Sequence, residues 1–204
     1  MFTENEINAL VTHPKIQEIT TELKNNFIEK SAPYLEMSNH DFMSLAMLTP
    51  TIGVALANGS VSLIEEMALN KKARKLSKGG YWMKKDPVVY AMGHLIKHFD
   101  DWSDEFLAYL KVIVEFSCDK AELLLSKVHE GDVSDEQFLI EVLRAPFIFI
   151  RLISSFFHND EEEDFVAIRN ISRVEYDRMI DYADKIGMGD VPIFKKYVTK
   201  LQVK

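Results

Sequence analysis

Three side chains that bind first-row metals share one side of a predicted helix: His94, His98 and Asp101, at positions i, i+4 and i+7. Together they could hold a zinc-type ion in a metal-dependent enzyme. Zinc proteases carry a glutamate directly after the first histidine, and this chain has Leu95 there. The same helix also carries a predicted buried stripe of apolar residues, made of Val88, Met92, Leu95, Phe99 and Trp102. Both histidines lie beside or opposite that stripe, which favours a solvated polar surface over a metal site.

A second candidate is the basic segment 71–85, which has seven of the chain's 24 lysine and arginine residues and no acidic residue. Its candidate anion-binding residues are Lys71, Lys72, Arg74, Lys75, Lys78, Tyr81 and Trp82. Cations beside glycines and aromatic rings are typical of contacts with phosphates or single-stranded nucleic acid. However, lysine and arginine also stabilise the C-terminal end of a helix, and aromatic side chains often pack on the core. We favour this structural explanation and keep an anion or nucleic-acid site as the alternative.

Other reactive residue types lack the neighbours that catalysis requires. The single cysteine, Cys118, continues a helical apolar row and is expected to be a small buried hydrophobic residue. The acidic run 160–164 precedes a predicted helix, whose dipole stabilises negative charge, and it lacks the alternating ligands of an EF-hand. The chain has no Gly-x-Ser-x-Gly motif and no Glu-x-x-His motif. We therefore expect neither catalytic residues nor a cofactor.

The composition of the 204-residue chain is that of a soluble globular protein, with 47% hydrophobic and 27% charged residues. These proportions exclude collagen-like, fibrous and fully disordered chains. A formal net charge of −8 opposes binding of nucleic acid or anionic lipid over the whole surface. The longest apolar stretch, 145–157, contains Arg151 and is too short for the roughly 20 residues of a membrane span. The first residues lack the basic and apolar parts of a secretory leader, so we expect a cytoplasmic protein.

Apolar residues recur at helical spacing along almost the whole chain, whereas strict alternation is nearly absent. This pattern predicts an all-α, single-domain globular bundle of about eight or nine helices over residues 1–204. The expected helix starts are marked by capping residues or prolines, at Thr3 with Glu6, Pro14, Ser38 with Asp41, Pro50, Pro87, Ser103, Ser134 with Gln137, and Pro192. A further helix should follow the acidic run and end at Gly187.

Two segments are expected at the centre of the bundle. The most hydrophobic predicted helix, 135–157, should be surrounded by other helices, with a dimer seam or the wall of an apolar cavity as alternatives. Residues 51–70 are nearly all apolar or small, and small residues such as Gly53 would let another helix approach closely. In an alternative interpretation, one helix ends at Gly59 and a new one begins at Ser62.

These observations favour a non-catalytic helical protein that acts by binding. The expected partner is another protein or a second copy of the chain, and an apolar small molecule held inside the bundle is a further option. The first alternative is an anion or nucleic-acid binder that uses the segment 71–85, although the net charge disfavours nucleic acid. The second alternative is a metal-dependent enzyme that uses His94 and His98.

Overall fold

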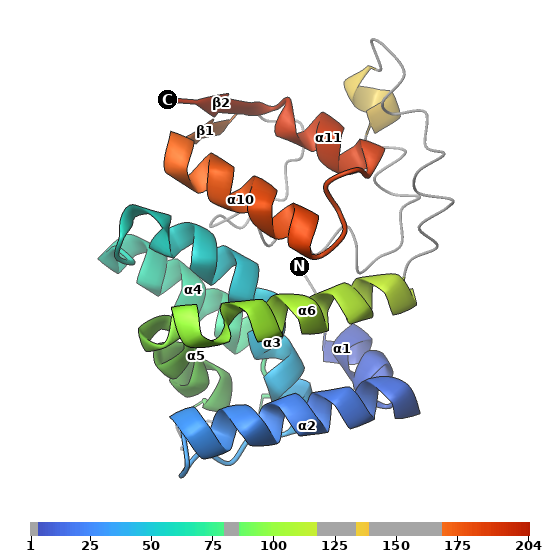
Figure 1. Ribbon diagram of the computed structural model, residues 1–204, viewed down its shortest axis with the longest axis vertical. Coiled ribbons are helices and arrows are strands. Elements are labelled where there is room, and N and C mark those ends of the chain that lie inside the picture. Colours follow the sequence, from blue (N-terminus) through green and yellow to red (C-terminus); the bar gives the residue numbers. More distant parts are fainter. Residues whose placement is uncertain (1–3, 80–85, 118–133, 139–168) are drawn as a thin grey trace.

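The computed structural model describes residues 4–79, 86–117, 134–138 and 169–204, which form helices and one small sheet (Figure 1). In chain order the elements are α1 (Glu4–Val11), α2 (Pro14–Ser31), α3 (Asn39–Ala55), η1 (Leu56–Asn58), α4 (Leu63–Leu76), α5 (Pro87–Lys97), α6 (Phe99–Ser117), β1 (Arg169–Ile171), α10 (Arg173–Lys185), α11 (Pro192–Val198) and β2 (Leu201–Val203). The all-α fold expected from the sequence is confirmed.

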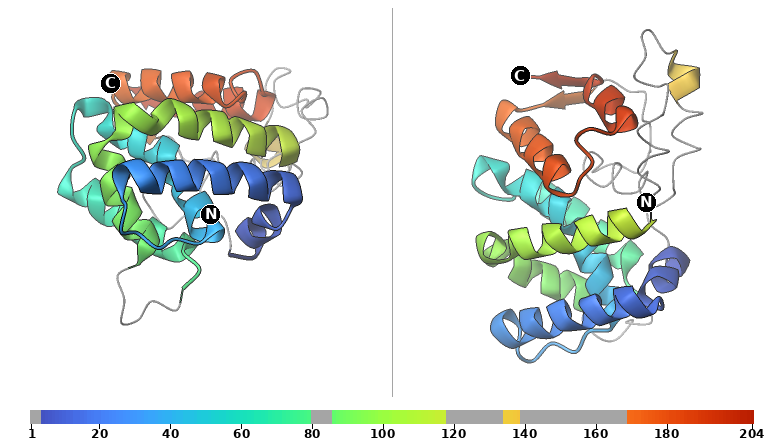
Figure 2. Two further views of the ribbon diagram at one scale, coloured as in Figure 1. Left: turned by 60° about the horizontal axis from the view of Figure 1, so that its bottom comes forward. Right: turned by 45° about the vertical axis from the view of Figure 1, so that its right-hand side comes forward.

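Helix α3 is the centre of the described structure. Fifteen of its 17 residues are buried, and it contacts α1, α2, α4, α5, α6 and α10. Figure 2 shows α2, α6 and α10 lying in successive rows across one side of α3. A helix that is covered on all sides must be apolar or small nearly all round. The sequence of α3 meets this condition, because its ionisable residues, His40 and Asp41, both lie in its first turn.

The central position that the sequence predicted for residues 51–70 is correct only as far as the end of α3. The chain turns at Gly59, whose φ of 92° is in the left-handed region that favours glycine. Helix α4 then begins with a capping box, in which the backbone N–H of Ser62 donates to Glu65 Oε2 at 2.8 Å. Most of α4 is at the surface. The alternative interpretation, with a helix end at Gly59, is therefore confirmed.

The other segment that the sequence placed at the centre, 135–157, lies largely outside the described residues. Its expected start is confirmed, because the backbone N–H of Gln137 donates to Ser134 Oγ at 3.2 Å and the N–H of Ser134 donates to Gln137 Oε1 at 3.3 Å. Phe138 is fully buried. Cys118 and the acidic run 160–164 also lie outside the described residues.

The helix break expected at Pro50 is wrong. Helix α3 begins at the predicted cap, where Ser38 Oγ accepts the backbone N–H of Asp41 at 3.1 Å, but it continues through Pro50 to Ala55. A proline inside a helix removes one backbone donor and crowds the carbonyl four residues earlier, which is Ala46 here. Both Ala46 and Pro50 are buried. Packing on every side of α3 therefore maintains a helix that the local sequence would break.

Local signals correctly predicted the starts of several other helices. Proline is the first residue of α2, α5 and α11, at Pro14, Pro87 and Pro192. In front of α5, Asp86 Oδ1 accepts the backbone N–H of Val88 at 2.9 Å. These starts depend only on neighbouring residues, which explains why the sequence was sufficient.

Two helix starts differ from the sequence prediction. Helix α6 begins at Phe99 rather than Ser103, and acidic residues in its first turn stabilise its N-terminal end. Helix α10 begins at Arg173, after a capping box that was not among the predicted starts, in which the backbone N–H of Ser172 donates to Glu175 Oε2 at 2.9 Å. The predicted end of this helix is confirmed, because Gly187 has a φ of 79°.

A two-stranded parallel sheet joins the segment before α10 to the segment after α11. Strands β1 and β2 pair with Arg169 opposite Leu201 and Ile171 opposite Val203. The pairing extends by one residue, since the backbone N–H of Lys204 donates to the carbonyl of Ile171 at 2.9 Å. The sequence did not indicate these strands, because three residues are too few to show an alternating pattern.

Aromatic rings hold α2 and α6 against α3. The ring of Phe27 lies 5.1 Å from that of Trp102 and 5.5 Å from that of Phe106, and Phe42 lies 5.3 Å from Phe106. Such tilted and edge-on pairs add to the stabilisation from burial alone. The indole N–H of Trp102 donates to Ser31 Oγ at 2.7 Å, so the one polar atom of this ring has a partner.

Alkaline pH is expected to destabilise this fold through Tyr109. Its hydroxyl lies 2.7 Å from Thr20 Oγ1, and burial raises the pKa of Tyr109 above the ordinary 10.0, against the smaller lowering effect of this hydrogen bond. Above pH 10 the unfolded chain loses a proton that the folded chain keeps. Tyr109 therefore makes its whole contribution to the free energy of unfolding below pH 10. This contribution decreases as the pH rises above 10.

Urea unfolding of Tyr109→Phe and the parent between about pH 8 and about pH 11 tests this dependence. The free energy of unfolding of the parent should fall more steeply with pH than that of the variant. The difference between the two should be about 1.4 kcal/mol for each pH unit above 10. Tyr34→Phe is the control, because Tyr34 is 99% exposed and should leave the slope unchanged. Identical slopes for the parent and Tyr109→Phe would contradict the role of Tyr109.

Candidate functional site

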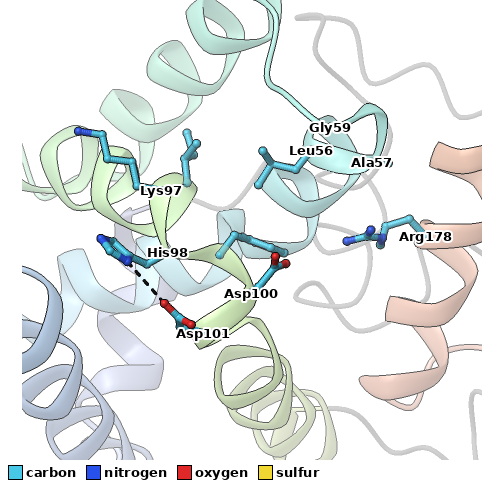
Figure 3. A pocket seen from close by; sticks show the side chains of 10 residues that line it. Leu56, Ala57, Gly59, Lys97, His98, Asp100, Asp101 and Arg178 are labelled. Carbon is cyan, nitrogen blue, oxygen red and sulfur yellow. Dashed lines mark ion pairs between the residues drawn. The ribbon is translucent and has the colours of Figure 1, made fainter.

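A half-open pocket of about 490 Å³ lies between η1, the junction of α5 with α6, and α10 (Figure 3). Leu56, Ala57 and Gly59 form the η1 side, and the segment 96–101 forms the junction side. Arg178 reaches the pocket from α10. The volume is within the range of small-molecule sites, roughly 300–1,000 Å³. Three segments that are distant in the sequence therefore build one polar pocket.

Arg178 is the most firmly positioned cation of this pocket. Its guanidinium NH1 donates to Tyr182 Oη at 3.1 Å, and its central carbon lies 5.8 Å from the centre of the Tyr182 ring. The hydrogen bond with Tyr182 and, more weakly, the charges of Asp100 and Asp181 raise the pKa of Arg178. This is the only side-chain hydrogen bond that Arg178 makes with another described residue.

Tyr182 is held in turn by a close approach to α3. An alanine Cβ at Gly53 would overlap with Tyr182 Cε2 and would lie 2.7 Å from Phe99 Cζ. The ring centres of Tyr182 and Phe99 are 6.4 Å apart, so both rings occupy the space above this glycine. The close approach that the sequence predicted at Gly53 is confirmed. A glycine in the central helix thus positions the tyrosine that orients Arg178.

The three metal-competent residues do not come together as one group. His98 Nδ1 lies 3.5 Å from Asp101 Oδ2 at the surface, whereas the ring of His94 packs against Tyr90 with centres 4.9 Å apart. Within the described part of the chain, no three histidine, cysteine, aspartate or glutamate side chains are close enough to hold a metal ion. The predicted buried stripe beside them is confirmed at Val88, Met92, Leu95, Phe99 and Trp102.

The basic segment divides into an exposed part and a buried residue. The exposed cations are Lys71, Arg74, Lys75 and Lys78. Lys72 is only 6% exposed and is therefore not part of an outward-facing cationic surface, contrary to its place in the predicted set. Tyr81 and Trp82 lie outside the described residues.

The first two turns of α4 expose large apolar side chains. Leu63 is 73% exposed, Ile64 is 79% exposed and Met67 is 65% exposed. On the same helix, Lys71, Arg74 and Lys75 are also exposed, at the spacing of successive turns. We call these six residues the α4 face. The sequence did not indicate the apolar half of this face, because hydrophobicity alone predicts that these residues lie in the core.

A buried carboxylate joins the start of α3 to the end of α4. Asp41 is fully buried, accepts the hydroxyl of Ser38 at 2.6 Å and accepts the backbone N–H of Lys78 at 2.9 Å. Ser44 Oγ lies 2.8 Å from the carbonyl oxygen of Leu76. The distance between His40 Nδ1 and Asp41 Oδ1 is 3.9 Å. Because its bonds go to the backbone of Leu76 and Lys78, this cluster fixes the C-terminal end of α4 against α3 and has a structural role.

The chain matches no protein-family model, and no curated protein or solved structure is significantly similar to it. None of the helices in the described ranges is both long and apolar enough to cross a membrane.

Proposed function

We propose that the protein is a non-catalytic interaction module of the cytoplasm and that the α4 face is its contact surface for another protein. The observation that supports this function is the exposure of Leu63, Ile64 and Met67 in adjacent turns of one helix. Single exposed apolar side chains are normal, but a contiguous group with polar residues at its edge is typical of a protein contact. Transfer of these side chains from water to a partner supplies the driving force.

The exposed basic side chains of the α4 face favour a partner with acidic side chains. Lys71, Arg74 and Lys75 follow the apolar group along the helix, in a chain whose net charge is −8. A complementary surface has apolar side chains followed by acidic ones, as an amphipathic acidic helix does. Nucleic acid is the weaker candidate, because it has phosphates for the cations but nothing that requires three exposed aliphatic side chains.

A photo-crosslinking amino acid in place of Met67 tests this proposal inside cells. We expect one dominant protein adduct, because Met67 is in the middle of the apolar group. The same probe in place of Glu22, an exposed residue of α2, is the matched control and should give no such adduct. An adduct of twice the mass of the chain would indicate a second copy, and a nuclease-resistant adduct of any other mass would indicate a different protein.

The double variant Leu63→Ser and Ile64→Ser completes the test. It should abolish the adduct formed at position 67 while the thermal unfolding curve stays close to that of the parent, since both side chains are already exposed. Equal adducts at positions 67 and 22, or none at either, would refute the proposal. A nuclease-sensitive adduct would support the nucleic-acid alternative instead.

A further inference from the structure

The pocket beside α10 has an arginine on one side and the carboxylates of Asp100 and Asp101, with Lys97, on the other. Arg178 projects from α10 and Asp100 projects from the first turn of α6, and the two side chains face each other across the opening (Figure 3). Apolar residues also line the pocket, namely Leu56, Ala57, Ile96 and Phe99, and the polar residues Lys97, His98 and Asp101 lie on the same side as Asp100. Mostly polar walls with a small apolar part favour a small polar ligand that has a short apolar portion.

Arg178 has the form of a preorganised carboxylate site. A guanidinium has five N–H donors in a planar fork, and a hydrogen bond with Tyr182 is the one that Arg178 makes within the described residues. The remaining donors match the two oxygens of a carboxylate. Tyr182 is itself fixed by Gly53 and Phe99, so little conformational entropy is lost when a ligand binds.

Asp100 is the carboxylate that remains available for a cation. Its neighbour Asp101 already lies 3.5 Å from His98, whereas Asp100 makes no side-chain hydrogen bond or ion pair with another described residue. Asp100 is nevertheless close enough to Arg178 for its charge to raise the pKa of the guanidinium. An anion alone would be repelled by Asp100, and a cation alone would be repelled by Arg178.

We propose that this pocket binds a small zwitterion, namely a free amino acid or a short peptide, with its carboxylate on Arg178 and its ammonium group on Asp100. A ligand of this class satisfies both charges at once, which neither a simple anion nor a simple cation does. The residues of the pocket are separate from those of the α4 face, so this inference goes beyond the proposed function and does not depend on it.

Calorimetric titration of the whole chain with free amino acids and unblocked dipeptides tests the inference. Each amino acid is paired with its N-acetyl derivative, which lacks the ammonium group, and with its carboxamide, which lacks the carboxylate. We expect saturable binding of at least one parent compound, and roughly 10- to 100-fold weaker binding of both blocked forms, because each loses a charge-assisted hydrogen bond. Dipeptides that bind more tightly than every amino acid would identify a peptide ligand.

Three substitutions locate the binding site. Arg178→Gln should weaken binding by roughly 10- to 100-fold and Asp100→Asn by roughly tenfold, since each removes one charged contact. Arg173→Gln is the matched control, because Arg173 is on the same helix but pairs with Asp177 at 3.0 Å outside the pocket. Its dissociation constant should equal that of the parent. Because Asp100 is exposed, Asp100→Asn should fold, and it can test the site by itself if Arg178→Gln does not fold.

Several results would overturn the inference. One is the lack of saturation by every compound up to roughly 10 mM, which corresponds to negligible affinity. Another is equal binding of a parent compound and its blocked forms, and a third is unchanged binding in both pocket variants. The double variant at Leu63 and Ile64 should bind the zwitterion as the parent does, so failure of the α4 proposal would be distinguishable from failure of this one.

Discussion

Replacement of Gly53 by alanine is expected to lower the free energy of unfolding by about 2 to 3 kcal/mol, although alanine has the higher helix propensity. The added Cβ would overlap with Tyr182 Cε2 and lie 2.7 Å from Phe99 Cζ, in the last turn of the central helix α3. Tyr182 is buried and Phe99 is buried, so either ring can make room only by disturbing the packing of α10 or α6 on α3. Urea unfolding followed by circular dichroism measures the loss.

Gly93→Ala is the matched control for this substitution. Gly93 is an exposed residue of α5, and a Cβ there would have no neighbour within 4 Å. The same chemical change should therefore raise the free energy of unfolding by about 0.5 to 1 kcal/mol, through helix propensity alone. If both variants were stabilised to the same extent, the close packing of Tyr182 on Gly53 would be disproved.

Replacement of Asp41 by alanine is the second large effect, with an expected loss of about 3 kcal/mol. The variant would leave the backbone N–H of Lys78 and the hydroxyl of Ser38 without the acceptor that they have now. Partly buried donors without acceptors are costly because they have also lost their water. The loss should be visible in urea unfolding and should be accompanied by faster proteolysis near the end of α4.

Asp104→Ala is the control for removal of a carboxylate. Asp104 is 83% exposed, and its partner Lys185 lies 2.9 Å away. Exposed ion pairs contribute little, so the expected change is at most about 0.5 to 1 kcal/mol. A comparable loss in the two variants would show that burial of Asp41 is not the source of its effect.

The sequence was most informative wherever a structural decision depends on neighbouring residues. Helices start at Pro14 and Pro87 because proline lacks a backbone N–H donor, and the chain turns at Gly59 because glycine allows a positive φ. Both properties belong to single residues. Pro50 shows the limit of this reasoning. Its local preference for a helix start is outweighed by contacts with six other helices, which no local pattern contains.

The candidate sites were harder to predict than the fold. The sequence singled out His98 and Asp101, which do line the pocket, but not Arg178, because α10 reaches the pocket through tertiary packing on η1, α3 and α6. The α4 face was not predicted because its apolar residues looked like core residues. Hydrophobicity indicates which side chains avoid water, but it does not distinguish burial in the chain's own core from burial against a partner.

The strand pair gives α10 and α11 a property that the other described helices lack. Since β1 precedes α10 and β2 follows α11, this region is a loop whose two ends are hydrogen-bonded to each other. Such a closed loop should open as one cooperative unit in native-state hydrogen exchange, and not fray helix by helix. Any molecule held by Arg178 would then slow exchange at the amide of Lys204 as well, so the far end of the chain would report on whether the pocket is occupied.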